Sequence, residues 1–204
     1  MKAEDWMKRV CVGVLALAAI AGGTVRNISG QGAPAKITVE STAFKDGETL
    51  PDDYSSFGKN VSPPLSWSGA PATTRQFAVV CHDPDAPMPG GFTHWVIYKI
   101  PASAKGLPQA VPAGANVTAS GLAGTIQGAN GFAAFARRGG PPPEPSYRGP
   151  APPAGPAHHY HFTVYAIDGA VELQPGLDRN GLLKAIEGHI VGQGEIVGLY
   201  QRKA

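Results

Sequence analysis

The sequence has very little cysteine, no long hydrophobic run and almost no excess of charge of one sign. It contains two cysteines in 204 residues, Cys11 and Cys81. Cys11 lies in an N-terminal segment that we expect to be removed, so Cys81 is the single cysteine of the mature chain. An intrachain disulfide is therefore excluded, and the stability of the fold has to come from packing.

The charge balance is close to neutral. Seventeen basic and 15 acidic residues are spread along the chain and give a formal net charge of +2. Such a distribution provides no basic surface for nucleic acid, which we exclude as a partner. Hydrophobic residues make up 43% and charged residues 16% of the chain, so the composition is not that of a disordered protein. The 27 glycines and 20 prolines indicate many turns rather than long helices and predict a mostly β fold.

The N-terminal apolar run, residues 10–21, is too short to cross a membrane as a helix, which takes about 20 residues. Lys8 and Arg9 precede the run, and Ala19-Ile20-Ala21 fits a small-x-small cleavage site. We therefore predict a secretory signal peptide over residues 1–21 and a periplasmic or secreted protein. The alternative is an uncleaved N-terminal anchor, because Glu4 and Asp5 dilute the basic region.

The remaining chain is predicted to form one domain, residues 36–204, after a polar, glycine-rich tether over residues 22–35. A helix is expected to begin near Asp178, with Asp178 or Asn180 as its N-cap and with Leu182, Leu183 and Ile186 on one face. Alternating or β-branched residues predict strands at residues 36–41, 75–82, 94–100, 158–167 and 195–200.

A proline-rich segment, GGPPPEPSYRGPAPPAGP at residues 139–156, permits two interpretations. Its composition is typical of a disordered linker. It lies between two strong strand signals, however, and each proline fixes its own φ angle and restricts the residue before it. The segment can therefore also form a rigid wall.

Acidic residues and histidines gather where the predicted strands begin and end. Since residues two apart share a face of a sheet, Asp83 continues the apolar row of Phe77, Val79 and Cys81. The same rule places His94 with Val96, Tyr98 and Ile100. It places His158 and Tyr160 with Phe162, and turns His159 and His161 to the other face. The candidate constellation is Asp83, Asp85, His94, His158 and Tyr160.

Three kinds of site compete with the simplest interpretation, in which the aspartates form turns and the histidines are structural. A metal site from His94, His158 and one aspartate is possible, but the sequence has no CxxC, HExxH or calcium-loop motif. A nucleophile is disfavoured because there is no GxSxG motif and Cys81 lies within a strand. A pocket for a small anion fits best, since imidazole N–H groups and a tyrosine hydroxyl are suitable donors. We therefore expect no enzyme activity, no cofactor and no metal.

Several motifs occur in one order along residues 36–202, and together they resemble the phosphatidylethanolamine-binding protein family, in particular its bacterial Raf-kinase-inhibitor-like branch. The motifs are Ser62-Pro63-Pro64-Leu65-Ser66-Trp67, Asp83-Pro84-Asp85-Ala86-Pro87, His94-Trp95-Val96, Tyr147-Arg148-Gly149-Pro150-Ala151-Pro152-Pro153, His158-His159-Tyr160, Gly188-His189-Ile190 and Gly198-Leu199-Tyr200.

The resemblance implies a large central antiparallel sheet packed on a smaller one, with a short helix near the C-terminus. It also implies a pocket for phosphate, phosphoethanolamine or a similar phospholipid headgroup, and so contact with a membrane surface through lipid headgroups. A regulator that binds a kinase or protease around the same pocket is the alternative, and a metal-dependent hydrolase is a second one. Carried over to this chain, the pocket wall consists of Asp83, Pro84, Asp85, His94, Pro153, His158 and Tyr160.

The sequence departs from the family pattern at two places. His159 stands where the family usually has arginine, which puts any contact of that arginine in doubt. Residues 136–146 resemble an insertion that carries Arg137 and Arg138. This insertion is either a solvated loop or an electrostatic extension of the pocket.

Overall fold

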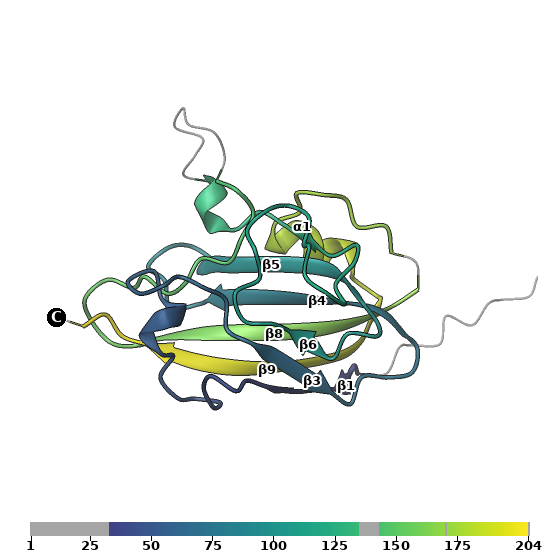
Figure 1. Cartoon of the computed structure of the whole chain (residues 1–204), viewed down its shortest axis with the longest axis horizontal. Helices are drawn as coiled ribbons and strands as arrows, with labels where there is room; N and C mark the ends of the chain where they lie inside the picture. Colours follow the sequence, from purple (N-terminus) through teal and green to yellow (C-terminus); the bar gives the residue numbers. More distant parts are fainter. Residues whose placement is uncertain (1–32, 135–142, 170, 204) are drawn as a thin grey trace, which may run out of the picture. The chain divides into compact units, whose positions relative to one another are not determined.

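The computed structural model describes residues 33–134, 143–169 and 171–203, which form two β-sheets and one α-helix (Figure 1). The predicted signal peptide, residues 22–32 of the predicted tether and residues 136–142 of the predicted insertion lie outside the described residues. The mostly β fold, with two sheets and a short helix, is confirmed.

The large sheet has the strand order β1-β9-β8-β4-β5-β7 within the described residues. β1 pairs with β9 in parallel, and the other strand pairs of this sheet are antiparallel. The long strands at its centre are rich in β-branched and aromatic residues, which suit a surface that is buried on both faces. The strands are β1 (Ala35–Lys36), β9 (Ile190–Tyr200), β8 (His158–Asp168), β4 (Thr74–Asp83), β5 (Phe92–Pro101) and β7 (Ile126–Gln127).

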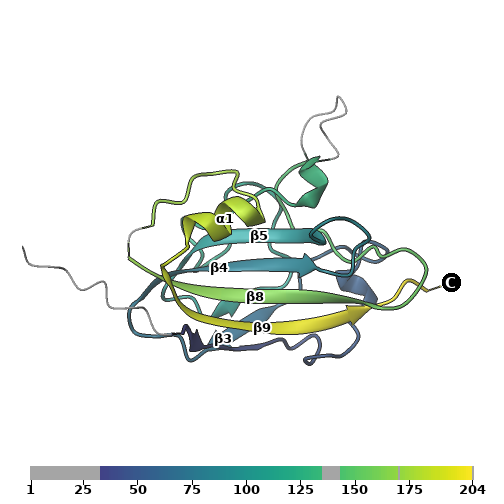
Figure 2. The same cartoon turned by 180° about the vertical axis from the view of Figure 1, so that it is seen from behind.

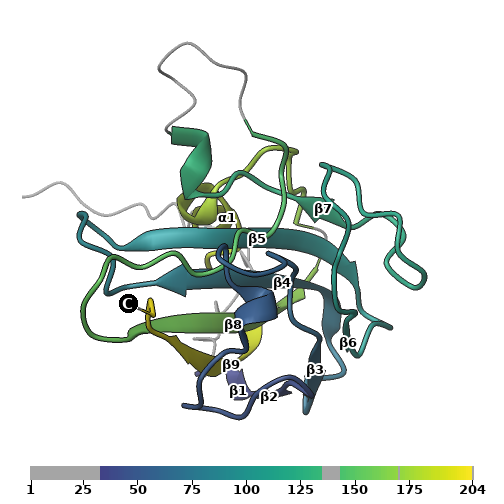
Figure 3. The same ribbon diagram turned by 60° about the vertical axis from the view of Figure 1, so that its left-hand side comes forward.

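The small sheet packs on one face of the large sheet (Figure 3). It consists of β2 (Thr38–Glu40), β3 (Leu65–Ser68) and β6 (Gly106–Leu107), paired antiparallel. The main hydrophobic core lies between the sheets, where the ring centroids of Trp67 in β3 and Phe77 in β4 are 5.2 Å apart. Phe162 in β8 belongs to the same core.

The other face of the large sheet is covered by α1 (Arg179–Ala185) (Figure 2). Leu182 and the C-cap residue Ile186 are fully buried against Val80 and Tyr98, as the predicted apolar face requires, and Leu183 packs partly buried beside them. Two short 3-10 helices, η1 (Asp52–Tyr54) and η2 (Gly131–Ala134), complete the described elements.

The N-cap of α1 is Asp178, the first of the two predicted candidates. Its Oδ1 accepts a hydrogen bond of 2.8 Å from the backbone N–H of Gly181. Replacing Asp178 by Ala removes this acceptor and is expected to lower the free energy of unfolding by about 1 kcal/mol, whereas Asp178→Asn should change it little. Urea unfolding followed by circular dichroism measures both variants, and equal midpoints for Asp178→Ala and the parent would contradict the assignment.

Two strand predictions need correction. Residues 36–41 do not form one strand, because the chain passes from β1 in the large sheet to β2 in the small one at Ile37, which is buried between them. β9 begins at Ile190 rather than at residue 195. Its first half contains Gly192 and Gly194, and a Cβ added at Gly194 would lie 1.9 Å from the Ile37 carbonyl oxygen. Glycine therefore lets β9 approach Ile37, but it also hides the strand pattern.

Candidate functional site

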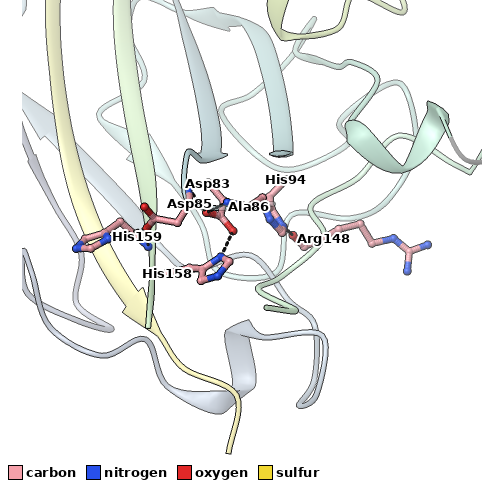
Figure 4. Close-up of polar contacts among 7 residues, drawn as sticks. All are labelled: Asp83, Asp85, Ala86, His94, Arg148, His158 and His159. Atoms are coloured by element: carbon pink, nitrogen blue, oxygen red, sulfur yellow. Dashed lines mark hydrogen bonds and ion pairs between the residues drawn. The ribbon is translucent and has the colours of Figure 1, made fainter. Parts of the chain in front are cut away.

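Asp83, the last residue of β4, connects three parts of the site (Figure 4). Its Oδ1 accepts hydrogen bonds from the backbone N–H groups of Asp85 and Ala86, at 2.9 and 3.1 Å. Its Oδ2 accepts a hydrogen bond of 2.9 Å from Nδ1 of His158, the first residue of β8. Both side chains are buried. This carboxylate therefore fixes the start of the loop after β4 and orients the His158 ring.

His94 reaches the site through a β-bulge. Cys81 is opposite Trp95, but the next residue of β4, His82, is opposite Thr93, so His94 is the extra residue in β5. The prediction that His94 shares a face with Val96 and Tyr98 is therefore wrong, since those two side chains belong to the core beneath α1. His94 packs instead against Tyr160, with ring centroids 5.1 Å apart.

Burial determines the protonation of His94. It lowers the pKa of the imidazole from 6.5 to about 4, so the ring is neutral at physiological pH. Nδ1 lies 2.7 Å from the backbone carbonyl oxygen of Arg148. Because a carbonyl oxygen only accepts, Nδ1 carries the hydrogen, and Nε2 of the neutral ring is a hydrogen-bond acceptor.

The Tyr160 hydroxyl is a buried polar group that lies near the Asp83 carboxylate but forms no hydrogen bond of ordinary geometry within the described residues. The side chain is fully buried, and among the described residues no group of ordinary geometry forms a hydrogen bond with the hydroxyl. Burial and the nearby Asp83 carboxylate raise the pKa of Tyr160, so the hydroxyl is protonated. An unsatisfied buried donor costs about 1–3 kcal/mol, which a ligand that accepts a hydrogen bond would recover.

These side chains surround a cavity of about 380 Å³. Five of the seven residues predicted for the pocket wall line it, namely Asp83, His94, Pro153, His158 and Tyr160. Their roles in ligand binding stay predictions, but the structure places them together.

The other two predicted wall residues do not line this cavity. Asp85 turns outward, where its Oδ2 accepts hydrogen bonds from the backbone N–H and from Nδ1 of His159, at 2.8 and 2.7 Å. These bonds lower the pKa of the Asp85 carboxyl. Pro84 lines a separate hollow with His82 and His161 on the side of the sheet that carries α1. Both residues lie in the loop after β4, where the direction of a side chain does not follow strand alternation. Their roles in ligand binding also stay predictions.

The described part of the proline-rich segment is a wall of the cavity and not a linker. Ala151, Pro152 and Pro153 line the cavity. The segment is held to the domain by the Tyr147 hydroxyl, which donates to the Tyr54 carbonyl oxygen at 2.8 Å, and by the Gly149 N–H, which donates to Asn60 Oδ1 at 2.8 Å.

Sequence reasoning missed several lining residues. Met88 and Phe92 belong to the loop and strand that carry the predicted residues, and Phe132 belongs to η2. These three residues could not be recognised as site residues in the sequence, because apolar side chains most often belong to the hydrophobic core. Arg202 also lines the cavity. It follows β9, whose last residue, Tyr200, is opposite His158 in the sheet, so only the strand pairing reveals its position.

The described residues do not bring together the ligands that the metal-site alternative requires. In the part of the chain that the structure describes, no group of three or more His, Cys, Asp or Glu side chains could hold a metal ion. Nδ1 of His94 and Nδ1 of His158 are both engaged by protein oxygens.

Comparisons with known proteins agree with this fold and site. Residues 40–201 match the family model described as phosphatidylethanolamine-binding protein. A UPF0098 protein of Methanothermobacter thermautotrophicus is 38% identical over 166 residues, which cover 81% of this chain and 99% of that protein. The UPF0098 protein YbhB of Escherichia coli is 37% identical over 133 residues, which cover 63% of this chain and 76% of YbhB.

A solved structure shows the same architecture. The crystal structure of Escherichia coli YbcL, a member of the PEBP family, aligns with a TM-score of 0.69 and 30% sequence identity over 83% of this chain and 100% of YbcL. The fold and the site define a two-sheet β protein with a small cavity at one end of the large sheet. The chain belongs to the phosphatidylethanolamine-binding protein family.

Proposed function

We propose that the cavity between Asp83, His94, His158 and Tyr160 binds a small phosphate-bearing ligand, without chemical conversion. The observation that carries this proposal is the Tyr160 hydroxyl, a buried donor without a partner in the described chain. An anionic oxygen of a ligand would accept its hydrogen bond. The cavity, at about 380 Å³, is of a size suited to a small ligand.

The protonation of His94 restricts which hydrogen-bonding groups the ligand must carry. Nε2 of neutral His94 accepts a hydrogen bond and therefore cannot donate to an anionic oxygen, contrary to our first expectation. A ligand that fits both groups needs an acceptor for Tyr160 and a donor for His94. Hydrogen phosphate carries both at neutral pH, and phosphoethanolamine, whose phosphate group is largely dianionic there, carries acceptor oxygens together with an ammonium donor. Sulfate has the same shape but no proton to donate.

Binding without catalysis is supported by the state of the one cysteine of the predicted mature chain. Burial raises the pKa of the Cys81 thiol well above its usual range, so it stays protonated and unreactive. The predicted signal peptide would place this binding activity in the periplasm or outside the cell. No helix within the described residues is long and apolar enough to cross a membrane.

The proposal is tested by adding phosphate to the purified protein while the histidine resonances are followed by NMR. Millimolar inorganic phosphate or phosphoethanolamine is expected to shift the His94 and His158 resonances, and sulfate should act at least several-fold more weakly. His94→Ala should lose the response. The matched control is His161→Ala, since His161 lies outside the cavity and pairs with Glu195. Unchanged spectra of the parent protein at millimolar phosphate would remove the proposal.

A further inference from the structure

The charge of the cavity poses a problem for an anionic ligand. The Asp83 carboxylate lines the cavity and is buried, and the equally buried His94 is neutral. Of the described residues that line the cavity, Arg202 is the one with a permanent positive charge. Among the described lining residues, Arg202 is therefore the cation that an entering anion can approach before it reaches the Tyr160 hydroxyl.

Arg202 is held at the mouth by an aromatic stack. The carbon atom of its guanidinium lies 5.3 Å from the ring centroid of Phe57. The Phe57 ring stacks in turn on Tyr200, with centroids 6.3 Å apart and an interplanar angle of 15°. Since Tyr200 pairs with His158 across the sheet, the stack is anchored beside the strand end that forms the cavity. η1 and the C-terminal end of β9 lie at the same end of the large sheet (Figure 1).

The tail that carries Arg202 is fixed on both sides of this residue. Before it, the Gln201 side-chain amide donates to the Gly155 carbonyl oxygen of the proline-rich wall, at 2.8 Å. After it, Lys203 forms an ion pair with Asp52. Asp52 also accepts a hydrogen bond from the Tyr200 hydroxyl at 3.2 Å, so the Asp52 carboxylate is already engaged.

Arg202 itself forms no ion pair within the part of the chain that the structure describes. It borders two hollows, the cavity and a neighbouring one of about 260 Å³ that is also lined by Phe57 and Tyr200. Phe57 is 52% exposed, which is unusual for a large apolar side chain, and its ring face meets the guanidinium. A cation on an aromatic face keeps its charge and its N–H donors available.

We propose that Arg202 forms an anion subsite at the mouth of the cavity, where its guanidinium binds the phosphate group of the ligand, and that Phe57 is a positioning residue that holds the guanidinium there. This inference rests on the proposed function and adds to it the charge that the cavity lacks. The positive charge of this subsite would favour phosphate over neutral ligands of similar size. Because the Arg202 guanidinium is exposed to water, its contribution to the free energy of phosphate binding is modest. Exposed ion pairs are weak and are screened by salt.

The test measures the affinity for inorganic phosphate by isothermal titration calorimetry in low salt. Arg202→Gln is expected to weaken binding about fivefold, and Arg202→Lys should retain most of the affinity. Phe57→Leu keeps the apolar volume but removes the ring, and should weaken binding about twofold. The matched control is Arg75→Gln, which removes the same charge from an exposed position at the opposite end of β4.

Salt provides a readout that a merely structural role would not change. Raising the ionic strength to about 0.5 M should bring the affinities of the parent and Arg202→Gln together, because the lost interaction is a screened charge contact. If the parent binds phosphate and Arg202→Gln binds it as tightly as Arg75→Gln does, the subsite is refuted while the proposed function stands. If the parent binds no phosphate at any salt concentration, the proposed function and the subsite are both refuted. Glycerophosphoethanolamine and phosphoethanolamine, compared in the same assay, distinguish diester from monoester ligands.

Discussion

Replacing Asp83 by Ala is expected to lower the free energy of unfolding by about 3 kcal/mol. Asp83 is only 3% exposed, and its carboxylate accepts three hydrogen bonds, two from the loop backbone and one from His158. Its loss leaves two backbone donors and one imidazole N–H without an acceptor, and such groups are costly when buried. Urea unfolding at pH 7 measures the difference.

Asp85 provides the matched control for this experiment, because it is an aspartate two residues away on the same loop. Its side chain is 41% exposed and pairs with His159, which is 53% exposed, so Asp85→Ala should cost no more than about 1 kcal/mol. Asp83→Asn, which keeps one acceptor oxygen for the loop backbone, should fall between the two and serves if Asp83→Ala does not fold. Equal losses for Asp83→Ala and Asp85→Ala would show that Asp83 does not hold the site together.

The stability of the protein is expected to fall as the pH is lowered from 7 to 5, and His94 should account for about 2 kcal/mol of the loss. The pKa of His94 is about 4 in the folded protein and 6.5 in the reference state. Below pH 6.5 the unfolded chain therefore takes up a proton that the folded protein does not. The stabilisation is complete above pH 6.5 and is lost progressively as the pH falls toward 4.

The comparison of the parent with His94→Asn isolates this effect. Asparagine does not titrate, and its amide can donate to the Arg148 carbonyl oxygen in place of Nδ1. The variant is expected to be less stable at pH 7 but to lose about 2 kcal/mol less than the parent between pH 7 and pH 5. Urea unfolding curves at both pH values give the four free energies. Parallel losses in the two proteins would mean that His94 is not held neutral by burial.

The central strands could be predicted because their side chains alternate over long runs. β4 and β8 agree closely with the predicted ranges 75–82 and 158–167. β6 and β7 have two residues each and form only because a neighbouring strand pairs with them, so no local pattern marks them. The glycines in the first half of β9 carry no side-chain pattern at all, although the close approach of Ile37 requires them.

The positions of the site residues could be predicted where they follow strand alternation. They could not be predicted where they depend on a local irregularity such as a β-bulge. Asp83, His158 and Tyr160 follow the alternation to the strand ends and were placed for the right reason. His94 lies in the cavity although the alternation put it on the opposite face, because a bulge is invisible in the sequence. Arg202 follows the last strand and had no periodic neighbour to reveal it.

The position of β9 has a consequence for the order in which the molecule forms. β9 pairs with both β1 and β8, although it is synthesised after every other described strand. The segment before η1 also depends on it, since the Leu50 N–H donates to the Leu199 carbonyl oxygen and Leu199 N–H to that of Glu48. The nascent chain therefore cannot bring Phe57 against Tyr200, or close the mouth of the cavity, until β9 has left the ribosome. The cavity mouth is therefore completed only after β9 has paired with β8.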